Sequence, residues 1–149
     1  MCYRHKLETQ NCFTALGTPE RIWAISAIHG DLEKLMNIHD AILENFEPGH
    51  KIIYLGNYTG HGEHSSQCVD EILSFRRLIL SLQAVRPSDF TYLRGNQEEM
   101  MDKLFQLPFA PNPIDIYLWM LGNGLSNTLL SYDISPHDGI EACRLGSVA

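Results

Sequence analysis

The chain of 149 residues is long enough to bury the core of one domain, and its 44% apolar and 19% charged residues are typical of a globular protein. A net charge of −7 without a block of like charges argues against nucleic acid or an anionic membrane as a partner. No apolar window resembles a membrane span or a secretion signal, and Cys2, Cys12, Cys68 and Cys143 form no Cys-x-x-Cys pair, so we expect a cytoplasmic protein with reduced thiols.

Short apolar runs alternate with longer amphipathic segments along the chain. After a lead-in over 1–20, the short runs predict strands at 21–28, 51–55 and 90–93. The longer segments predict helices after the N-cap Asp31, and then at 63–85, 98–107 and 114–130. This β-α-β-α-β-α order predicts an α/β fold with a mainly parallel sheet flanked by helices, extending over 21–133.

Three further expectations follow from the periodicity. Gly122-Asn123-Gly124 should interrupt the last helix, and 134–149 has no periodicity and should form a loose tail. In the helix after Asp31, the apolar residues that recur at helical spacing should form one buried face, and these are Leu32, Leu35, Met36, Ile42, Leu43 and Phe46. The pairs Met100-Met101 and Trp119-Met120 are also expected in the core.

A loop rich in glycine, amide and imidazole side chains follows each predicted strand. The first is Ser26-Ala27-Ile28-His29-Gly30, the second is Gly56-Asn57-Tyr58-Thr59-Gly60-His61-Gly62, and the third is Gly95-Asn96-Gln97-Glu98. Because parallel strands bring their carboxyl ends to one edge of the sheet, we expect these loops to meet there and to form the functional site.

The three loops resemble the signature blocks of the calcineurin-like metallophosphoesterases, most closely bacterial serine/threonine protein phosphatases. That family carries Gly-Asp-x-His-Gly, Gly-Asp-x-x-Asp-Arg-Gly and Gly-Asn-His-Glu after its first three strands, and the likeness spans residues 20–133 in the same order. The resemblance implies the N-terminal part of the family's α/β sandwich. It also implies a hydrolase that cleaves phosphoesters with two divalent metal ions such as Mn, Fe or Zn.

Carried over position by position, the resemblance places His29 and Asn96 at metal-ligand positions and Asn57 at the position of the bridging aspartate. Ala27 stands where the family has another ligand aspartate. Gly60 and His61 replace the Asp-Arg pair, so that His61 occupies the phosphate-binding position, and Gln97 occupies the catalytic histidine position. The family's other histidine ligands lie on a second sheet beyond the length of this chain, so we expect a truncated domain.

These replacements remove the chemistry of a two-metal phosphatase. Asn57 is neutral and offers one oxygen, and Ala27 offers none, so the ligand count falls below what a divalent ion requires. Gln97 has no titratable proton, and His61 lacks the arginine fork that holds a phosphate. We therefore expect a degenerate phosphatase-like protein, a pseudoenzyme with little or no activity whose metal ions are not bound or are weakly bound.

Two alternatives stay open. In the first, activity survives through a single ion held by His29, Asn57, His61, Asn96 and Glu98, or His29, His61 and His64 form a new metal cluster. In the second, the chain is a non-catalytic binding or regulatory module for a phosphoprotein or another phosphatase subunit. The module would use an apolar sheet face that a second sheet would otherwise cover.

Overall fold

A parallel three-stranded sheet forms one end of the molecule in the computed structural model, which describes residues 15–146. Strands β1 (Arg21–Ile25), β2 (His50–Tyr54) and β3 (Phe90–Tyr92) lie in the order β1-β2-β3. Ile25 pairs with Tyr54, which pairs with Tyr92. The predicted parallel α/β arrangement is confirmed, although β1 ends three residues before the predicted 28. Most of the predicted lead-in lies outside the described residues, and so do Cys2 and Cys12.

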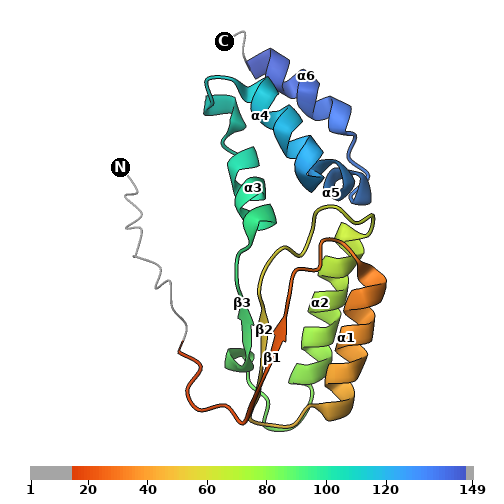
Figure 1. Ribbon diagram of the computed structural model, residues 1–149, viewed down its shortest axis with the longest axis vertical. Helices are drawn as coiled ribbons and strands as arrows, with labels where there is room; N and C mark the ends of the chain where they lie inside the picture. Colours follow the sequence, from red (N-terminus) through yellow and green to blue (C-terminus); the bar gives the residue numbers. More distant parts are fainter. Residues whose placement is uncertain (1–14, 147–149) are drawn as a thin grey trace.

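Helices α1 (Leu32–Asn45) and α2 (Ser65–Leu80) cover one face of the sheet (Figure 1). The predicted N-cap is confirmed, because the Asp31 carboxylate accepts a hydrogen bond from the Lys34 N–H at 3.1 Å. The predicted buried face of α1 is partly wrong, since Met36 and Leu43 are exposed. A polar residue, His39, takes a core position that the apolar pattern could not reveal.

His39 lies at the centre of a buried polar network in the sheet core. Its Nδ1–H donates to the Glu71 carboxylate at 2.6 Å, and its Nε2 accepts from the Tyr54 hydroxyl at 2.8 Å. Its ring stacks on Phe75 with 3.8 Å between centroids. Burial lowers the pKa of His39, although the Glu71 carboxylate opposes this change. The neighbouring core thiol of Cys68 is also buried, which raises its pKa to about 11.

The opposite face of the sheet is apolar and open. Side chains alternate along a strand, so the residues between the core-facing positions point away from α1 and α2. On this outer face Ile22 is 46% exposed, Leu55 is 45% exposed and Leu93 is 43% exposed. The expectation of an apolar sheet face is therefore confirmed, and no helix or strand among residues 15–146 packs over these side chains.

The rest of the chain forms short helices beyond the carboxyl ends of the strands (Figure 1). A 3-10 turn at Pro87–Asp89 precedes β3, and the helices that follow are α3 (Asn96–Leu104), a 3-10 turn at Leu107–Phe109, α4 (Pro113–Met120), a π-helical turn at Leu121–Leu125 and α5 (Ser126–Ser131). Gly124 has a φ of 108°, which confirms the predicted helix interruption. We call residues 96–146 the helical half and residues 15–95 the sheet half.

Two sequence expectations in the helical half are wrong. Residues 136–146 form helix α6 (Pro136–Gly146) instead of a loose tail, and Ile140 and Cys143 pack against the buried cluster around Tyr117. Two apolar contacts one turn apart are too sparse a pattern to predict this helix from the sequence. Trp119 is 56% exposed instead of buried, because Met120 beside it takes the core position.

Candidate functional site

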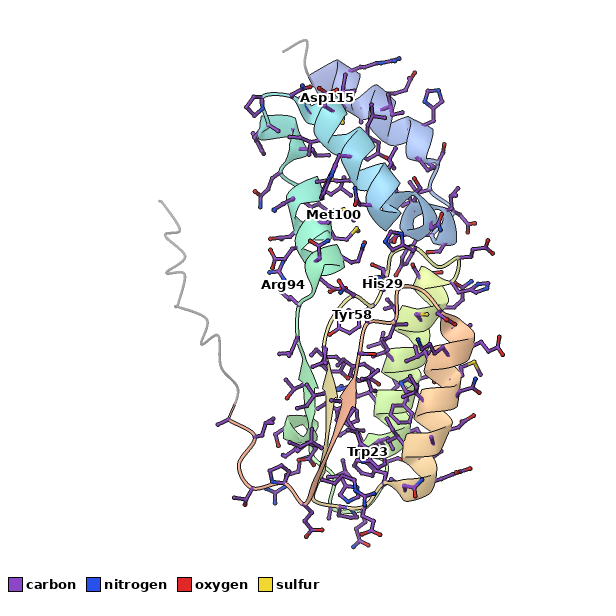
Figure 2. The ribbon with its side chains drawn as sticks, viewed as in Figure 1. Trp23, His29, Tyr58, Arg94, Met100 and Asp115 are labelled. Atoms are coloured by element: carbon purple, nitrogen blue, oxygen red, sulfur yellow. The ribbon has the colours of Figure 1, made fainter. Side chains whose placement is uncertain are left out.

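The three sequence-predicted loops meet at the carboxyl edge of the sheet, below the helical half. The backbone N–H groups of Ile28 and His29 both donate to the Asn57 carbonyl, at 3.0 and 2.8 Å. The Gly62 N–H donates to the His29 carbonyl at 2.5 Å. Figure 2 shows His29 and Tyr58 at this junction between the sheet and the upper helices. The sequence therefore placed these loops together correctly.

Two close backbone contacts explain why glycine recurs in the loops. A Cβ atom at Gly62 would lie 2.5 Å from the Gly30 carbonyl oxygen, closer than any side chain tolerates. A Cβ at Gly56 would collide with the Gly95 amide nitrogen in the same way. The glycines therefore let the first loop touch the second, and the second touch the third.

His29 and Asn57 both have a backbone conformation that is unusual for residues other than glycine. Their φ angles are 53° and 56°, in the left-handed region that is uncommon for side-chain-bearing residues. The Nδ1 atom of His29 is buried and has no hydrogen-bond partner among the described residues. Such an atom is rare in folded proteins. The His29 ring lies 5.5 Å from the His61 ring, between centroids.

Glu98 is a structural clamp for the loops. Its carboxylate accepts from three backbone N–H groups, those of Asn57 at 2.7 Å, Tyr58 at 2.9 Å and Gly95 at 2.7 Å. Charge-assisted bonds of this kind are stronger than bonds between neutral groups. Glu98 therefore fixes the second loop to the start of α3, and both of its oxygens accept backbone hydrogen bonds.

Amide side chains complete the junction. The Asn57 side-chain oxygen accepts from the Gln97 N–H at 3.0 Å. The buried Gln97 side chain lies against Gly60 and donates to the Asn123 carbonyl in the π-helical turn at 2.9 Å. Asn123 is not among the site residues predicted from the sequence, although its flanking glycines indicated a break in the helix there. Gln97 is thus a packing contact between the two halves.

The remaining predicted site residues are more exposed or make fewer hydrogen bonds within the site. Asn96 begins α3 and is exposed, and its side chain forms no hydrogen bond to any residue that the structure describes. His61 is exposed, and its backbone carbonyl accepts from the Asn127 side chain. Tyr58 is half-buried, and its hydroxyl donates to the Leu93 carbonyl at 2.7 Å. Burial, together with the Glu98 charge, raises the pKa of Tyr58.

The His, Cys, Asp and Glu side chains of residues 15–146 form no three-residue ligand group at these loops. His64 is exposed at the N-cap position of α2, where its side chain makes no capping hydrogen bond, and within residues 15–146 it forms no three-residue ligand group with His29 and His61. The three-residue group that does form is Glu20, Glu47 and His50, at the opposite end of the sheet. There the His50 Nδ1 accepts the Glu47 N–H at 3.0 Å, which leaves the proton of the neutral ring on Nε2. With Nδ1 accepting a hydrogen bond and Nε2 carrying the proton, neither nitrogen offers a lone pair to a metal ion in this arrangement.

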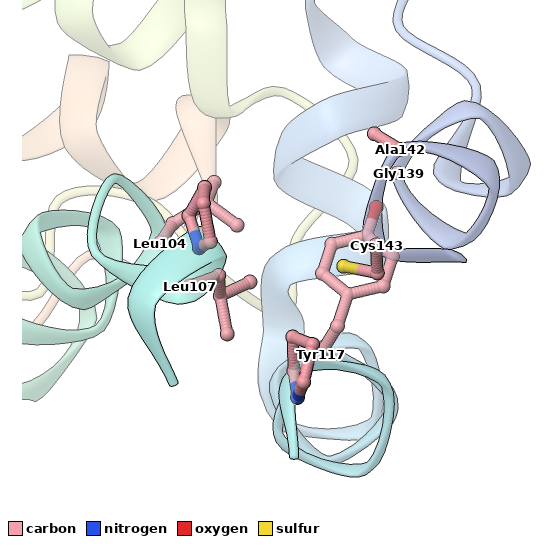
Figure 3. Close-up of a pocket in the computed structure, with 8 residues that line it drawn as sticks. Leu104, Leu107, Tyr117, Gly139, Ala142 and Cys143 are labelled. Atoms are coloured by element: carbon pink, nitrogen blue, oxygen red, sulfur yellow. The ribbon is translucent and has the colours of Figure 1, made fainter. Parts of the chain in front are cut away.

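An apolar cavity of about 160 Å³ lies away from the loops, beneath α6 (Figure 3). It is lined by Leu104, Leu107, Pro108, Pro113, Tyr117, Gly139, Ala142 and Cys143. Tyr117 closes one side, and its hydroxyl donates to the Pro136 carbonyl at 3.0 Å. The lining contains no charged side chain, so the cavity has no group that would bind a phosphate or a metal ion.

Comparisons with protein-family profiles, with curated proteins and with solved structures find no match for this chain. Among residues 15–146 no helix combines the length and the apolar character that crossing a membrane requires. Any assignment of function therefore depends on the chemistry of the loops and surfaces described above.

Proposed function

We propose that this chain is a metallophosphoesterase-like domain that has lost all or nearly all phosphatase activity. The observation that carries the proposal is the state of Glu98. It is the single carboxylate among the residues that could hold one ion, and three backbone N–H groups occupy it. Both oxygens of the one carboxylate therefore already accept hydrogen bonds that an ion would have to displace or share.

The ligand chemistry supports the same proposal. Two adjacent dications need an anionic bridge to offset their repulsion, and hydrolysis at such a pair depends on both ions. Asn57 is neutral, and its side-chain oxygen already accepts the Gln97 N–H. Ala27 has no ligand atom. The residues present do not fit a two-metal centre.

His29 supports a metal-binding ancestry. Its Nδ1 is buried without a partner, and a structural histidine would normally satisfy such an atom. As a former metal ligand, His29 would have stayed in place after the carboxylates around it were replaced. One imidazole does not hold a divalent ion tightly.

Hydrolysis of p-nitrophenyl phosphate with Mn²⁺ tests the proposal on the full chain. We expect a rate equal to that of a metal-free sample, and less than one equivalent of bound metal by elemental analysis. The matched variants are His29→Ala in the loops and His137→Ala on the exposed surface of α6. A Mn²⁺-dependent rate that His29→Ala abolishes and His137→Ala preserves would overturn the proposal.

A second candidate function is a binding or regulatory module, and the open sheet face favours it. Ile22, Leu55 and Leu93 leave an apolar surface without cover, as expected for a surface that meets a partner. The partner would be a phosphoprotein or a phosphatase subunit.

Titration with a purified bacterial serine/threonine phosphatase tests this second candidate. We expect Leu55→Lys to weaken binding at least tenfold, while Leu130→Lys, at an exposed leucine on α5, leaves it unchanged. Equal binding by both variants, or no binding by the unmodified chain, would count against this function.

A further inference from the structure

The β3 strand forms an unpaired edge of the sheet. It pairs with β2 on one side, and the Leu93 N–H donates to the Tyr54 carbonyl at 2.9 Å. Backbone groups alternate along a parallel strand, so the N–H and C=O of Tyr92 point away from β2. No other strand among residues 15–146 pairs with that edge, which lies on the open side of the sheet (Figure 1). An exposed edge of this kind can accept another strand.

An apolar groove runs beside this edge, between β3 and α2. Its lining is Tyr58, Val69, Ile72, Leu73, Arg76 and Tyr92, around a volume of about 340 Å³. A second hollow shares Tyr58 and Val69 and continues to Phe105 on the helical half. Leu73 and Tyr92 are both more than 40% exposed. Because side chains alternate along a strand, a segment added to β3 would place every second side chain in this groove.

Arg76 places one positive charge in the groove. Its guanidinium lies over the Phe90 ring, 5.9 Å from the centroid, and no carboxylate of residues 15–146 pairs with it. In contrast, Arg94 beyond the end of β3 pairs with Glu99 at 3.2 Å and with Asp102 at 3.3 Å. A half-buried guanidinium without an acidic partner, in a chain of net charge −7, favours a ligand that supplies a carboxylate.

We propose that the β3 edge and this groove bind an extended peptide of another protein by strand addition. The peptide pairs its backbone with Tyr92, places apolar side chains against Leu73 and Tyr92, and presents an Asp or Glu to Arg76. This site lies on the edge of the sheet, apart from the loops that contain His29 and Asn57, and it is independent of phosphatase activity. It also differs from the open face that carries Leu55.

Peptide binding to the full chain tests the proposal. The probes are fluorescent heptapeptides of alternating Val and Thr, in which each position in turn carries Glu, Gln or Lys. We expect saturable binding that is strongest for Glu at one position and about tenfold weaker for the matching Gln peptide, as one charge-assisted pair predicts. Methylation of alternate backbone nitrogens of the Glu peptide should abolish binding if its backbone pairs with β3.

Two variants of α2 separate the role of Arg76 from a general charge effect. Arg76→Gln should remove the preference for Glu over Gln, and its melting temperature shows whether the fold is intact. Arg77→Gln, at the exposed neighbouring residue, should keep the preference. Absence of saturable binding by every probe, equal loss in both variants, or insensitivity to backbone methylation would overturn the proposal.

The two other possible occupants give different results. A dimer in sedimentation velocity that the Glu peptide dissociates would assign the edge to a second copy of the chain. Binding that appears only after deletion of residues 1–14 would assign it to the chain's own N-terminal segment. Either result would overturn the proposal of a partner peptide, whether or not the loops hydrolyse a phosphoester.

Discussion

The sheet half and the helical half are built on different principles. In the sheet half, side chains of the strands and of α1 and α2 pack into one core. This core contains the hydrogen bonds that join His39 to Glu71 and Tyr54. The helical half has a separate apolar cluster, and the two clusters share no buried residue. The halves are joined by polar contacts such as Ser66 with Ser131 and the Asn127 side chain with the His61 carbonyl. The candidate loops therefore lie at a boundary between two cores.

The largest effect on the free energy of unfolding should come from replacing a core side chain of one half by alanine. Leu125→Ala should lower the free energy of unfolding of the helical half by about 2–5 kcal/mol, because Leu125 is fully buried there. Trp119 reports the helical half and Trp23 the sheet half, so urea unfolding of Trp23→Phe and Trp119→Phe backgrounds follows each half separately. We expect the Trp119 transition to shift and the Trp23 transition to stay. Ile52→Ala is the reverse control, since it should shift the Trp23 transition and leave the Trp119 transition in place. If both transitions shift together in both variants, the two cores do not unfold separately.

The buried network of the sheet half should make its stability depend on pH. The pKa of His39 in the folded chain is lowered from 6.5, so the unfolded chain binds more protons just below that pH. The contribution of His39 to the free energy of unfolding is therefore fully present above about pH 6.5. It decreases as the pH falls below that value toward the lowered pKa of the folded chain. His39→Leu should lower the free energy of unfolding by about 1–3 kcal/mol at pH 7.5, because Glu71 and Tyr54 lose their partner.

Urea unfolding of the sheet half at pH 7.5 and 5.5 measures this dependence. His39→Leu should reduce the difference between the two pH values, and His137→Leu, at an exposed histidine, should keep it. A pH difference that survives in His39→Leu would show that another group causes it.

At the boundary itself, Glu98→Gln should loosen the second loop. The amide keeps the shape of Glu98 but loses the charge and one acceptor for three backbone N–H groups, at a cost of about 1–3 kcal/mol. Hydrogen exchange of the Asn57, Tyr58 and Gly95 amides should become at least tenfold faster. Glu99→Gln removes only an exposed ion pair with Arg94, and unchanged exchange in that variant completes the comparison.

The smallest effect is expected at the most exposed aromatic residue of the helical half. Phe109 is 89% exposed, so Phe109→Ser should change the free energy of unfolding by less than about 0.5 kcal/mol. Urea unfolding followed by Trp119 measures it. A loss above 1 kcal/mol would mean that Phe109 packs on a part of the molecule that its exposure does not reveal.

The same contrast explains how far the sequence predicted the fold. In the sheet half, β2 is a short apolar run and Asp31 caps α1, and both signals are local, so the strands and helices were predicted within a few residues. In the helical half, α6 depends on contacts of Ile140 and Cys143 with the cluster around Tyr117, and Trp119 faces solvent because Met120 fills the core. Contacts between distant elements decided these positions, and no local pattern contains them.

The sequence predicted the position of the candidate site but did not predict the hydrogen bonds of its side chains. The glycines and the strand ends located the three loops, and these do meet. The use of Glu98 as a clamp was not predictable, because a glutamate that bonds backbone N–H groups has the same sequence signature as one that binds an ion. The contact between Gln97 and Asn123 was missed because it joins two elements 26 residues apart.

The strand order β1-β2-β3 has a consequence for how the chain is made. Each strand pairs with the one that precedes it in the sequence, so the sheet grows in the direction of translation. The sheet half can therefore assemble on the ribosome before the helical half has been synthesised. During that interval the nascent chain exposes both its β3 edge and its outer face, and exposed edges and apolar surfaces of this kind favour aggregation.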